Sequence, residues 1–344
     1  MKLVMTLLAR DEADIVDAQL AFHLNAGVDF VVATDNGSTD ATTEILERYD
    51  RAGFLHLIRE TANDMRQPEW VSRMARFAAT ELDADWVINA DADEFWWPRG
   101  GSLKDVLASV PLRYGVVRGC WRHFPPLPVD GEPFYERMTV RLCTPSRSGD
   151  KRTILHAHQK VAHRGTSDVV VEAGNHNAFG SGLEPLRGWH PLEVLHFSLR
   201  TAQQVRRKGG GGWLRNPEYE PTHHEIRLNE AVASGRVDDF FLAHVVTRER
   251  LEEGLADGTY AIDTRLRDAL RLLRAPDKSF PVPAPGATSP LSFPTPNAED
   301  TGAYACEATT LVEIDAIVRA EERVEALEER VQALGWPRRR LARR

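Results

Sequence analysis

Apolar runs and amphipathic stretches alternate along the first hundred residues. The apolar runs have the length of strands, and the stretches between them carry apolar residues at helical spacing. Near-continuous apolar strands separated by helices are typical of a parallel sheet that is covered on both faces. Strands are predicted at 2–9, 28–34, 54–58 and 85–90, and helices at 12–26, 41–52 and 68–83.

Polar clusters follow three of these predicted strands. They are Arg10-Asp11-Glu12, the turn at 35–38 (Asp-Asn-Gly-Ser), and the segment 91–94 (Asp-Ala-Asp-Glu). Right-handed crossovers bring the carboxyl ends of parallel strands to one edge of the sheet, where ligands of open α/β sheets bind. We therefore expect the three clusters to converge in space.

The rest of the chain is less regular. Residues 101–215 have the pattern of a mixed-sheet half that carries acceptor-facing loops. Short strands are predicted within 114–124, 134–143, 153–163, 168–174 and 192–199. A short basic helix precedes four glycines at 209–212. We thus expect a 1–215 domain made of two halves (1–100 and 101–215), then a helical extension at 216–275, a proline-rich linker at 276–300, and a C-terminal amphipathic helix and basic tail at 301–344.

Composition narrows the classes of function. The 344 residues have a formal net charge of −8, which gives no case for nucleic-acid binding. Cys120, Cys143 and Cys306 form no CxxC pair, so a reducing compartment fits. The first apolar run is shorter than a signal peptide requires and no later run has the length of a membrane span, so we expect a cytoplasmic protein. Three interpretations fit the C-terminal helix and its basic tail: peripheral contact with a membrane or another acidic partner, self-association, or a solvated tail without a partner.

The acidic segment 91–94 is the strongest candidate for chemistry. Asp91 and Asp93 are two residues apart, so in extended or tight-turn backbone their carboxylates reach one point. Two charges about 4 Å apart repel by roughly 4 kcal/mol at an effective dielectric of 20. Such a pair favours a bound cation, and oxygen ligands suit Mg²⁺ or Mn²⁺ with substrate phosphates filling the other positions. The alternative is a solvated acidic loop.

The longer sequence pattern resembles a known family. The segment "LLARDEADIVDAQLAFHLNAGVDFVVATDNGSTDATTEIL", followed by "DWVINADADEFWWP", is similar to the nucleotide-binding half of family 2 glycosyltransferases of the GT-A fold. The resemblance implies a Rossmann-like, mostly parallel sheet flanked by helices, in which 1–100 would be the nucleotide-binding half and 101–215 the acceptor half. It also implies a metal-dependent glycosyltransferase that takes a sugar, of the hexosyl type, from a nucleotide diphosphate sugar. The transfer is mostly inverting in this family, and the sequence does not identify the acceptor.

The same resemblance implies roles for individual residues. Arg10 and Glu12 would lie near the nucleotide, and Asp35 at its base or ribose. Lys208, beside the glycine run, would meet the diphosphate.

For the metal, Mn²⁺ or Mg²⁺, the resemblance makes Asp93 the main ligand. Asp91 would lie near the ribose or the metal. His196, in the similar element "VLHFSLRT", would complete the metal site.

An inverting transfer needs a general base near the acceptor hydroxyl. No motif identifies it here, and four carboxylates are candidates: Glu136, Asp168, Glu172 and Glu184. Trp96 and Trp97 directly follow the acidic segment. They would stack on a sugar or pack in the core, and we expect core packing for at least one of them.

Two other functions remain open at this point. A phosphohydrolase also uses a DxD pair after a strand, although it usually places the pair after the first strand. A non-catalytic nucleotide-sugar-binding protein, associating through its C-terminal helix, would show the same donor-site residues without turnover.

Overall fold

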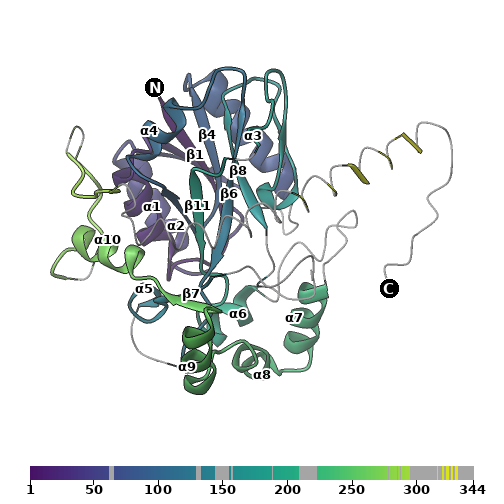
Figure 1. Cartoon of the computed structure of the whole chain (residues 1–344). Helices are drawn as coiled ribbons and strands as arrows, with labels where there is room; N and C mark the ends of the chain where they lie inside the picture. Colours follow the sequence, from purple (N-terminus) through teal and green to yellow (C-terminus); the bar gives the residue numbers. More distant parts are fainter. Residues whose placement is uncertain are drawn as a thin grey trace.

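The computed structural model describes most of the chain (Figure 1). The described residues are 1–61, 66–128, 133–143, 155, 158–187, 189–208, 223–277, 279–284, 286, 288–294, 316, 320, 323, 324, 327, 330 and 331. The glycines at 209–212, the end of the predicted linker (295–300) and most of the predicted C-terminal helix lie outside this set.

The predicted strands and helices of the first ninety residues are confirmed. Four parallel strands lie in the order β3-β2-β1-β4, with each helix crossing between consecutive strands. The elements are β1 (Leu3–Ala9), α1 (Val16–Asn25), β2 (Phe30–Asp35), α2 (Thr42–Arg51), β3 (Leu55–Arg59), α3 (Gln67–Thr80) and β4 (Trp86–Asp91).

The same sheet continues into the second half of the domain as a mixed sheet. Beyond β4 the order is β8-β6-β11-β5, which gives the sheet eight strands among the described residues. Strand β8 is antiparallel to β4 and β6, β11 is parallel to β6, and β5 is antiparallel to β11. The elements are β5 (Glu94–Pro98), α4 (Leu103–Ala108), β6 (Val116–His123), β8 (Gln159–Arg164), β9 (Val170–Val171), a 3₁₀ turn η1 (Ala173–Asn175), β10 (Ala178–Phe179) and β11 (Leu192–His196).

One local prediction was wrong. The segment 134–143 is not one strand, since it forms the short helix α5 (Phe134–Arg137) and then β7 (Val140–Leu142). Residues 94–98, for which no element was predicted, form a further strand. The C-terminal part is mostly helical as predicted, but it also contributes a strand that pairs with β7. Its elements are α6 (Ala202–Lys208), α7 (His223–Ala233), α8 (Val237–Leu242), α9 (Arg248–Asp257), β12 (Tyr260–Ile262) and α10 (Arg265–Leu273).

Helices cover both faces of the sheet, and alternate residues of β1 supply both cores. Leu3, Met5 and Leu7 belong to the larger core, which also holds residues of α1, α2, α4 and α10. Val4 belongs to a second core, beneath α3. Figure 1 shows α1, α2 and α4 on one side of the strands and α3 on the other. The alternation follows from the two-residue period of a strand, and it explains why the strand sequences read as continuously apolar.

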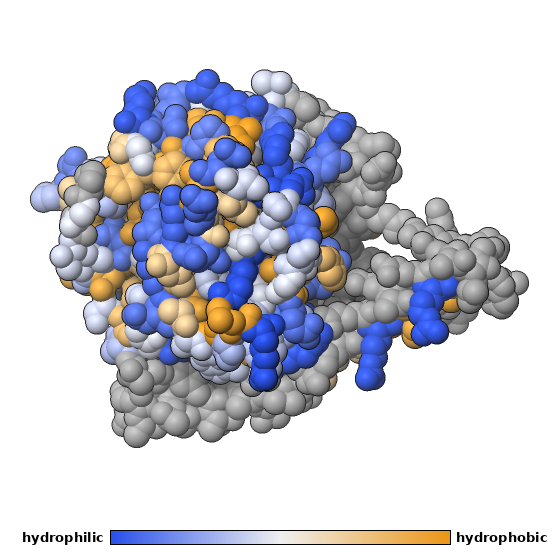
Figure 2. Space-filling model, turned by 90° about the horizontal axis from the view of Figure 1, so that it is seen from above, coloured by the Kyte–Doolittle hydropathy of each residue, from blue (hydrophilic) through white to orange (hydrophobic). Residues whose placement is uncertain are grey.

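Within the described part of the chain, no helix has the length and apolar character needed to cross a bilayer. Seen from above, hydrophilic residues surround scattered apolar ones over much of the visible surface (Figure 2).

Two fully buried histidines make the stability depend on pH. Burial lowers the pKa values of His23 and His163 to about 4 each. The unfolded chain binds a proton at each near pH 6.5, so their contribution is complete above that pH and is lost as the pH falls toward 4. We expect each to cost about 2 kcal/mol of unfolding free energy between pH 7 and pH 5.

Urea unfolding at the two pH values measures this loss. His23 Nε2 accepts from the Trp96 backbone N–H at 3.0 Å, and its Nδ1 lies 2.8 Å from the Gln19 carbonyl oxygen. Glutamine offers one acceptor and donors for the same partners but does not titrate. His23→Gln should therefore flatten the pH dependence, and an unchanged slope would contradict this assignment.

Candidate active site

The three polar clusters converge at the carboxyl edge of the parallel strands, as predicted. Arg10 Nη1 donates to Asn36 Oδ1 at 3.3 Å, which joins the ends of β1 and β2. Lys208 of α6 then joins the end of β1 to the acidic segment, because its Nζ lies 3.0 Å from Glu12 Oε1 and 2.6 Å from Asp93 Oδ2. Residues from four separate parts of the chain therefore meet at this edge.

The path of the acidic segment explains the position of Asp93. Strand β4 ends at Asp91, the chain turns at Ala92 and Asp93, and β5 begins at Glu94. β5 pairs with β11 in a register that sets Glu94 beside His196. The turn is fixed to β11 by the Phe197 N–H, which donates to the Asp93 carbonyl oxygen at 2.9 Å.

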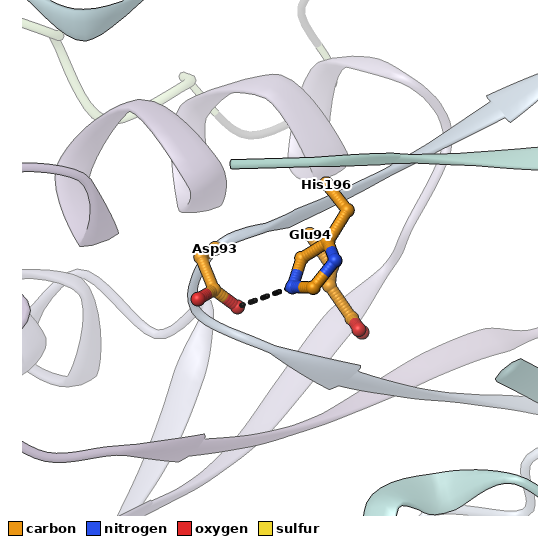
Figure 3. Close-up of side chains that lie close together, drawn as sticks. All are labelled: Asp93, Glu94 and His196. Atoms are coloured by element: carbon orange, nitrogen blue, oxygen red, sulfur yellow. Dashed lines mark ion pairs between the residues drawn. The ribbon is translucent and has the colours of Figure 1, made fainter. Parts of the chain in front are cut away.

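Asp93, Glu94 and His196 form a compact group of three potential metal ligands (Figure 3). One ligand atom from each lies within 4.8 Å of the others, and all three residues are buried. His196 Nε2 faces Asp93 Oδ1 at 3.7 Å, which is too far for a hydrogen bond. Two ligands of one ion, each about 2.1 Å from it, lie about 3–4 Å apart depending on the angle between them, so the pair leaves room for a shared divalent cation.

Strong positive charge surrounds Asp93. Besides Lys208, the fully buried guanidinium of Arg200 lies 3.8 Å from Asp93 Oδ2, and Arg200 also contacts Glu12 and Asp14. Burial alone would raise the pKa of Asp93, but Lys208, His196 and Arg200 together hold it well below its usual value. Asp93 is therefore ionised across the physiological range and is a competent ligand for a cation.

Asp91 and Glu94 are held instead by a lysine that the sequence analysis did not single out. Lys160 Nζ, buried on β8, lies 2.5 Å from Asp91 Oδ2 and 2.9 Å from Glu94 Oε1. Asp91 Oδ1 also accepts from Gln67 and Asn175. Burial raises the pKa of Glu94 to about 8, and Lys160 opposes that shift only in part. The two aspartates of the DxD motif thus have different partners.

A tryptophan of β6 connects these two groups. The Trp121 ring stacks on His196 with centroids 4.4 Å apart, and its Nε1–H donates to Glu94 Oε1 at 2.9 Å. His196 Nδ1 lies 3.2 Å from His123 Nδ1. The ring position of His196 is therefore set by its neighbours on β6. Trp121 and His123 in the 116–123 stretch, and Lys160 as the one lysine of the alternating 159–164 stretch, are the signals that would have pointed to this layer.

Asp35 lies at the predicted edge but is engaged within its own loop. Its Oδ1 accepts from the Ser38 N–H and hydroxyl, and its Oδ2 accepts from the Thr43 hydroxyl at 2.5 Å. Asp40 similarly accepts from the Ala13 N–H and the Thr42 hydroxyl. Both carboxylates shape the turn after β2, and contact between Asp35 and a nucleotide stays a prediction.

The four candidates for the general base lie in different parts of the structure and have different partners. Glu136 pairs with Arg271 on the surface at 2.5 Å, and the exposed Asp168 accepts from Thr166 and Ser181. Glu184 is exposed beside the amino end of β6. Glu172 differs from the other three, because it directly precedes the turn η1, whose Asn175 donates to Asp91.

The tryptophans after the acidic segment pack into the core. Trp96 is fully buried, and Trp97 stacks on Phe22 with centroids 5.7 Å apart. Gly119 of β6 faces the Trp96 ring so closely that a Cβ would lie 2.9 Å from it. Both rings therefore wall the large core behind β5.

Comparison with known proteins bears on the same part of the molecule. Residues 7–122 match the model of glycosyltransferase family 92. The matched segment runs from β1 to β6 and contains Glu12, Asp93 and Glu94, whereas His196 and Lys208 lie beyond it. The predicted likeness to glycosyltransferases is confirmed at this level, and the narrower assignment to family 2 stays a prediction. A search of curated proteins found no match.

Solved structures similar to this chain include two glycosyltransferase complexes. S. aureus TarS residues 1–349 in complex with UDP is 14% identical, with 74% of this chain and 72% of that chain covered and a TM-score of 0.34. Mycobacterium tuberculosis glucosyl-3-phosphoglycerate synthase in complex with Mn²⁺, UDP and glucosyl-3-phosphoglycerate is 20% identical, with 35% of this chain and 44% of that chain covered and a TM-score of 0.26. TM-scores this low do not establish a shared fold, so the fold assignment rests on the strand order of this chain.

Proposed function

We propose that this protein transfers a sugar from a nucleotide diphosphate sugar to an acceptor and that a divalent cation, Mn²⁺ or Mg²⁺, assists the transfer. The observation that carries the proposal is the group of Asp93, Glu94 and His196, which lies at the carboxyl edge of the sheet and begins within the segment that matches a glycosyltransferase family. An inverting outcome and a hexosyl donor stay predictions from the sequence resemblance.

The donor set fits such a cation. Two carboxylates and an imidazole are ligands that Mn²⁺ accepts, and Mg²⁺ also binds through one or two carboxylates plus substrate phosphates. Asp93 and His196 are the first ligands in this proposal, since both oxygens of Glu94 already accept hydrogen bonds from Trp121 and from the Asp91 N–H. A bound cation would offset negative charge that develops on the departing diphosphate.

One of the two cationic side chains beside Asp93 would then bind the donor. Lys208 is the more accessible of the two, with 36% of its side chain exposed, whereas Arg200 is fully buried. In this proposal Lys208 contacts the diphosphate, and Arg200 holds Glu12 and Asp14 in place at the end of β1. Asp91, Asn36 and Arg10 lie along the edge toward β2, where the resemblance places the nucleotide.

Turnover of donors by the full chain tests the proposal. Nucleoside diphosphate release should be measured for a panel of nucleotide sugars with Mn²⁺, with Mg²⁺ and with a chelator. We expect slow release for one donor, stimulation by metal, and loss of activity with the chelator. Binding of a donor without release would favour the non-catalytic alternative, and release of phosphate from simple monoesters would favour a phosphohydrolase.

A further inference from the structure

One buried polar atom beside Asp91 has no hydrogen-bond partner among the described residues. It is the side-chain oxygen of Asn175, a residue with an exposed fraction of 1%. The amide nitrogen of Asn175 donates to Asp91 Oδ1 at 3.3 Å, and the reverse orientation would set the amide oxygen against a carboxylate. The oxygen is therefore the end of the amide that is left over, and a buried acceptor without a donor is costly.

The turn η1 holds this amide in place with an unusual backbone. Gly174 and Asn175 have φ angles of +73° and +58°, a region that side chains other than asparagine and aspartate rarely adopt. The Gly174 N–H donates to Gln67 Oε1 at 2.8 Å, and Gln67 Nε2 donates in turn to Asp91 Oδ1 at 3.2 Å. A strained backbone that is fixed to the same carboxylate as its side chain indicates that the position of Asn175 is a functional feature.

The turn lies on the side of Asp91 that is away from the predicted nucleotide site. It packs against α3 and β8, and β8 follows β4 in the sheet on the side opposite β1 and β2. The ring of His176, which directly follows η1, contacts the Trp121 ring with centroids 5.5 Å apart, and Trp121 stacks on His196. Two rings therefore connect the turn to a proposed metal ligand.

We propose that the side-chain oxygen of Asn175 accepts a hydrogen bond from a ring hydroxyl of the transferred sugar and that this contact selects the donor. The inference rests on the proposed function. A donor with its base along β1 and β2 and its diphosphate at Asp93 and Lys208 has its sugar at the far end, toward β8. A hydroxyl supplies the hydrogen that the Asn175 oxygen lacks. A sugar without that hydroxyl leaves the buried oxygen unpaired, so the site discriminates against it.

Donors that lack one hydroxyl test this contact. UDP-glucose, UDP-N-acetylglucosamine and GDP-mannose, with forms of each that lack a single sugar hydroxyl, are compared on the wild type and on Asn175→Gly. Glycine adopts the positive φ readily and removes the amide. For the wild type, we expect the loss of one particular hydroxyl to lower kcat/KM by about tenfold or more. Asn175→Gly should lower kcat/KM for the parent sugar by a similar factor, and loss of the same hydroxyl should then cost little more.

Two variants separate recognition of the hydroxyl from support of the turn. Gln67→Met removes the other amide that donates to Asp91 but keeps the Asn175 oxygen, so it should slow all donors alike and leave the preference for the hydroxyl intact. Asn177→Ala changes a partly exposed asparagine whose side chain makes no hydrogen bond with the described residues, and it should leave both rate and preference unchanged. Losses in Asn175→Gly that are equal for all donors would show a merely structural role and overturn the proposal. Dependence of Asn175 on a ribose hydroxyl, measured with donors that lack one, would overturn the assignment to the sugar.

The wild-type measurements keep this inference distinct from the proposed function. Turnover of a donor in which no hydroxyl depends on Asn175 would leave the function standing and refute the contact. Where a donor binds without turnover, the same comparison is made with dissociation constants from isothermal titration calorimetry. A chain that neither binds nor turns over any of these donors would overturn both proposals.

Discussion

The variant Asp93→Asn should lose about three orders of magnitude or more in metal-stimulated donor turnover, because a metal ion in such a site supplies several kcal/mol and each 1.4 kcal/mol is tenfold. Asparagine keeps the size of the side chain but removes the charge that faces His196 Nε2 at 3.7 Å and Lys208 Nζ at 2.6 Å. Initial rates of nucleoside diphosphate release, with and without Mn²⁺, measure the effect. The stabilisation of the fold by Mn²⁺ in a thermal-shift assay should be lost in parallel.

The matched control for this variant is Asp238→Asn. Asp238 pairs with Arg206 on the surface, where 64% of its side chain is exposed, so the same chemical change should leave turnover and metal binding intact. His196→Gln gives a second, independent loss of a ligand. Wild-type turnover by Asp93→Asn protein that is folded by circular dichroism would contradict the assignment of the metal site.

The variant Lys160→Met should lower the free energy of unfolding by about 3–5 kcal/mol. Lys160 Nζ is the cation shared by Asp91 and the fully buried Glu94, and methionine keeps most of the side-chain volume while removing the charge. Burial by itself would lower the pKa of Lys160, but the two carboxylates raise it above its usual value, so the lysine is charged in the folded state. Urea unfolding measures the loss.

Two further variants separate this charge effect from a simple loss of packing. Combining Lys160→Met with Glu94→Gln also replaces the buried carboxyl group that has lost its cation, so the double variant should recover part of the lost stability. Lys104→Met removes a lysine from an exposed pair with Asp29, 2.5 Å apart, and should cost less than about 1 kcal/mol. A Lys160→Met protein as stable as Lys104→Met would show that the buried pair contributes nothing.

The two predictions concern different halves of one motif. Asp93 turns toward His196, Arg200 and Lys208, whereas Asp91 and Glu94 turn toward Lys160. Loss of the first group should abolish turnover with the sheet intact, and loss of the second should destabilise the sheet itself. Measuring both activity and unfolding for each variant tests that division directly.

The sequence by itself determined the framework on which the site is built. The alternation of apolar strands with amphipathic helices predicted the four parallel strands β3, β2, β1 and β4, because a strand that is buried on both faces must be apolar throughout. The same rule predicted that Glu12, Asn36 and Asp93 would meet, since the carboxyl ends of parallel strands share an edge. These inferences needed only local pattern and the handedness of the crossovers.

Only the tertiary structure decided which partners the acidic residues have. Lys160, Trp121 and Arg200 come from distant parts of the chain and reach the site because β8, β6 and the end of β11 extend the sheet beyond β4. Pairing between strands far apart in sequence depends on register, and a shift of one residue would turn Glu94 and His196 away from each other. Local sequence pattern does not encode that register. The sequence therefore located the acidic segment, whereas the strand pairing in the mixed half of the sheet determined that Asp93 and Asp91 have different neighbours.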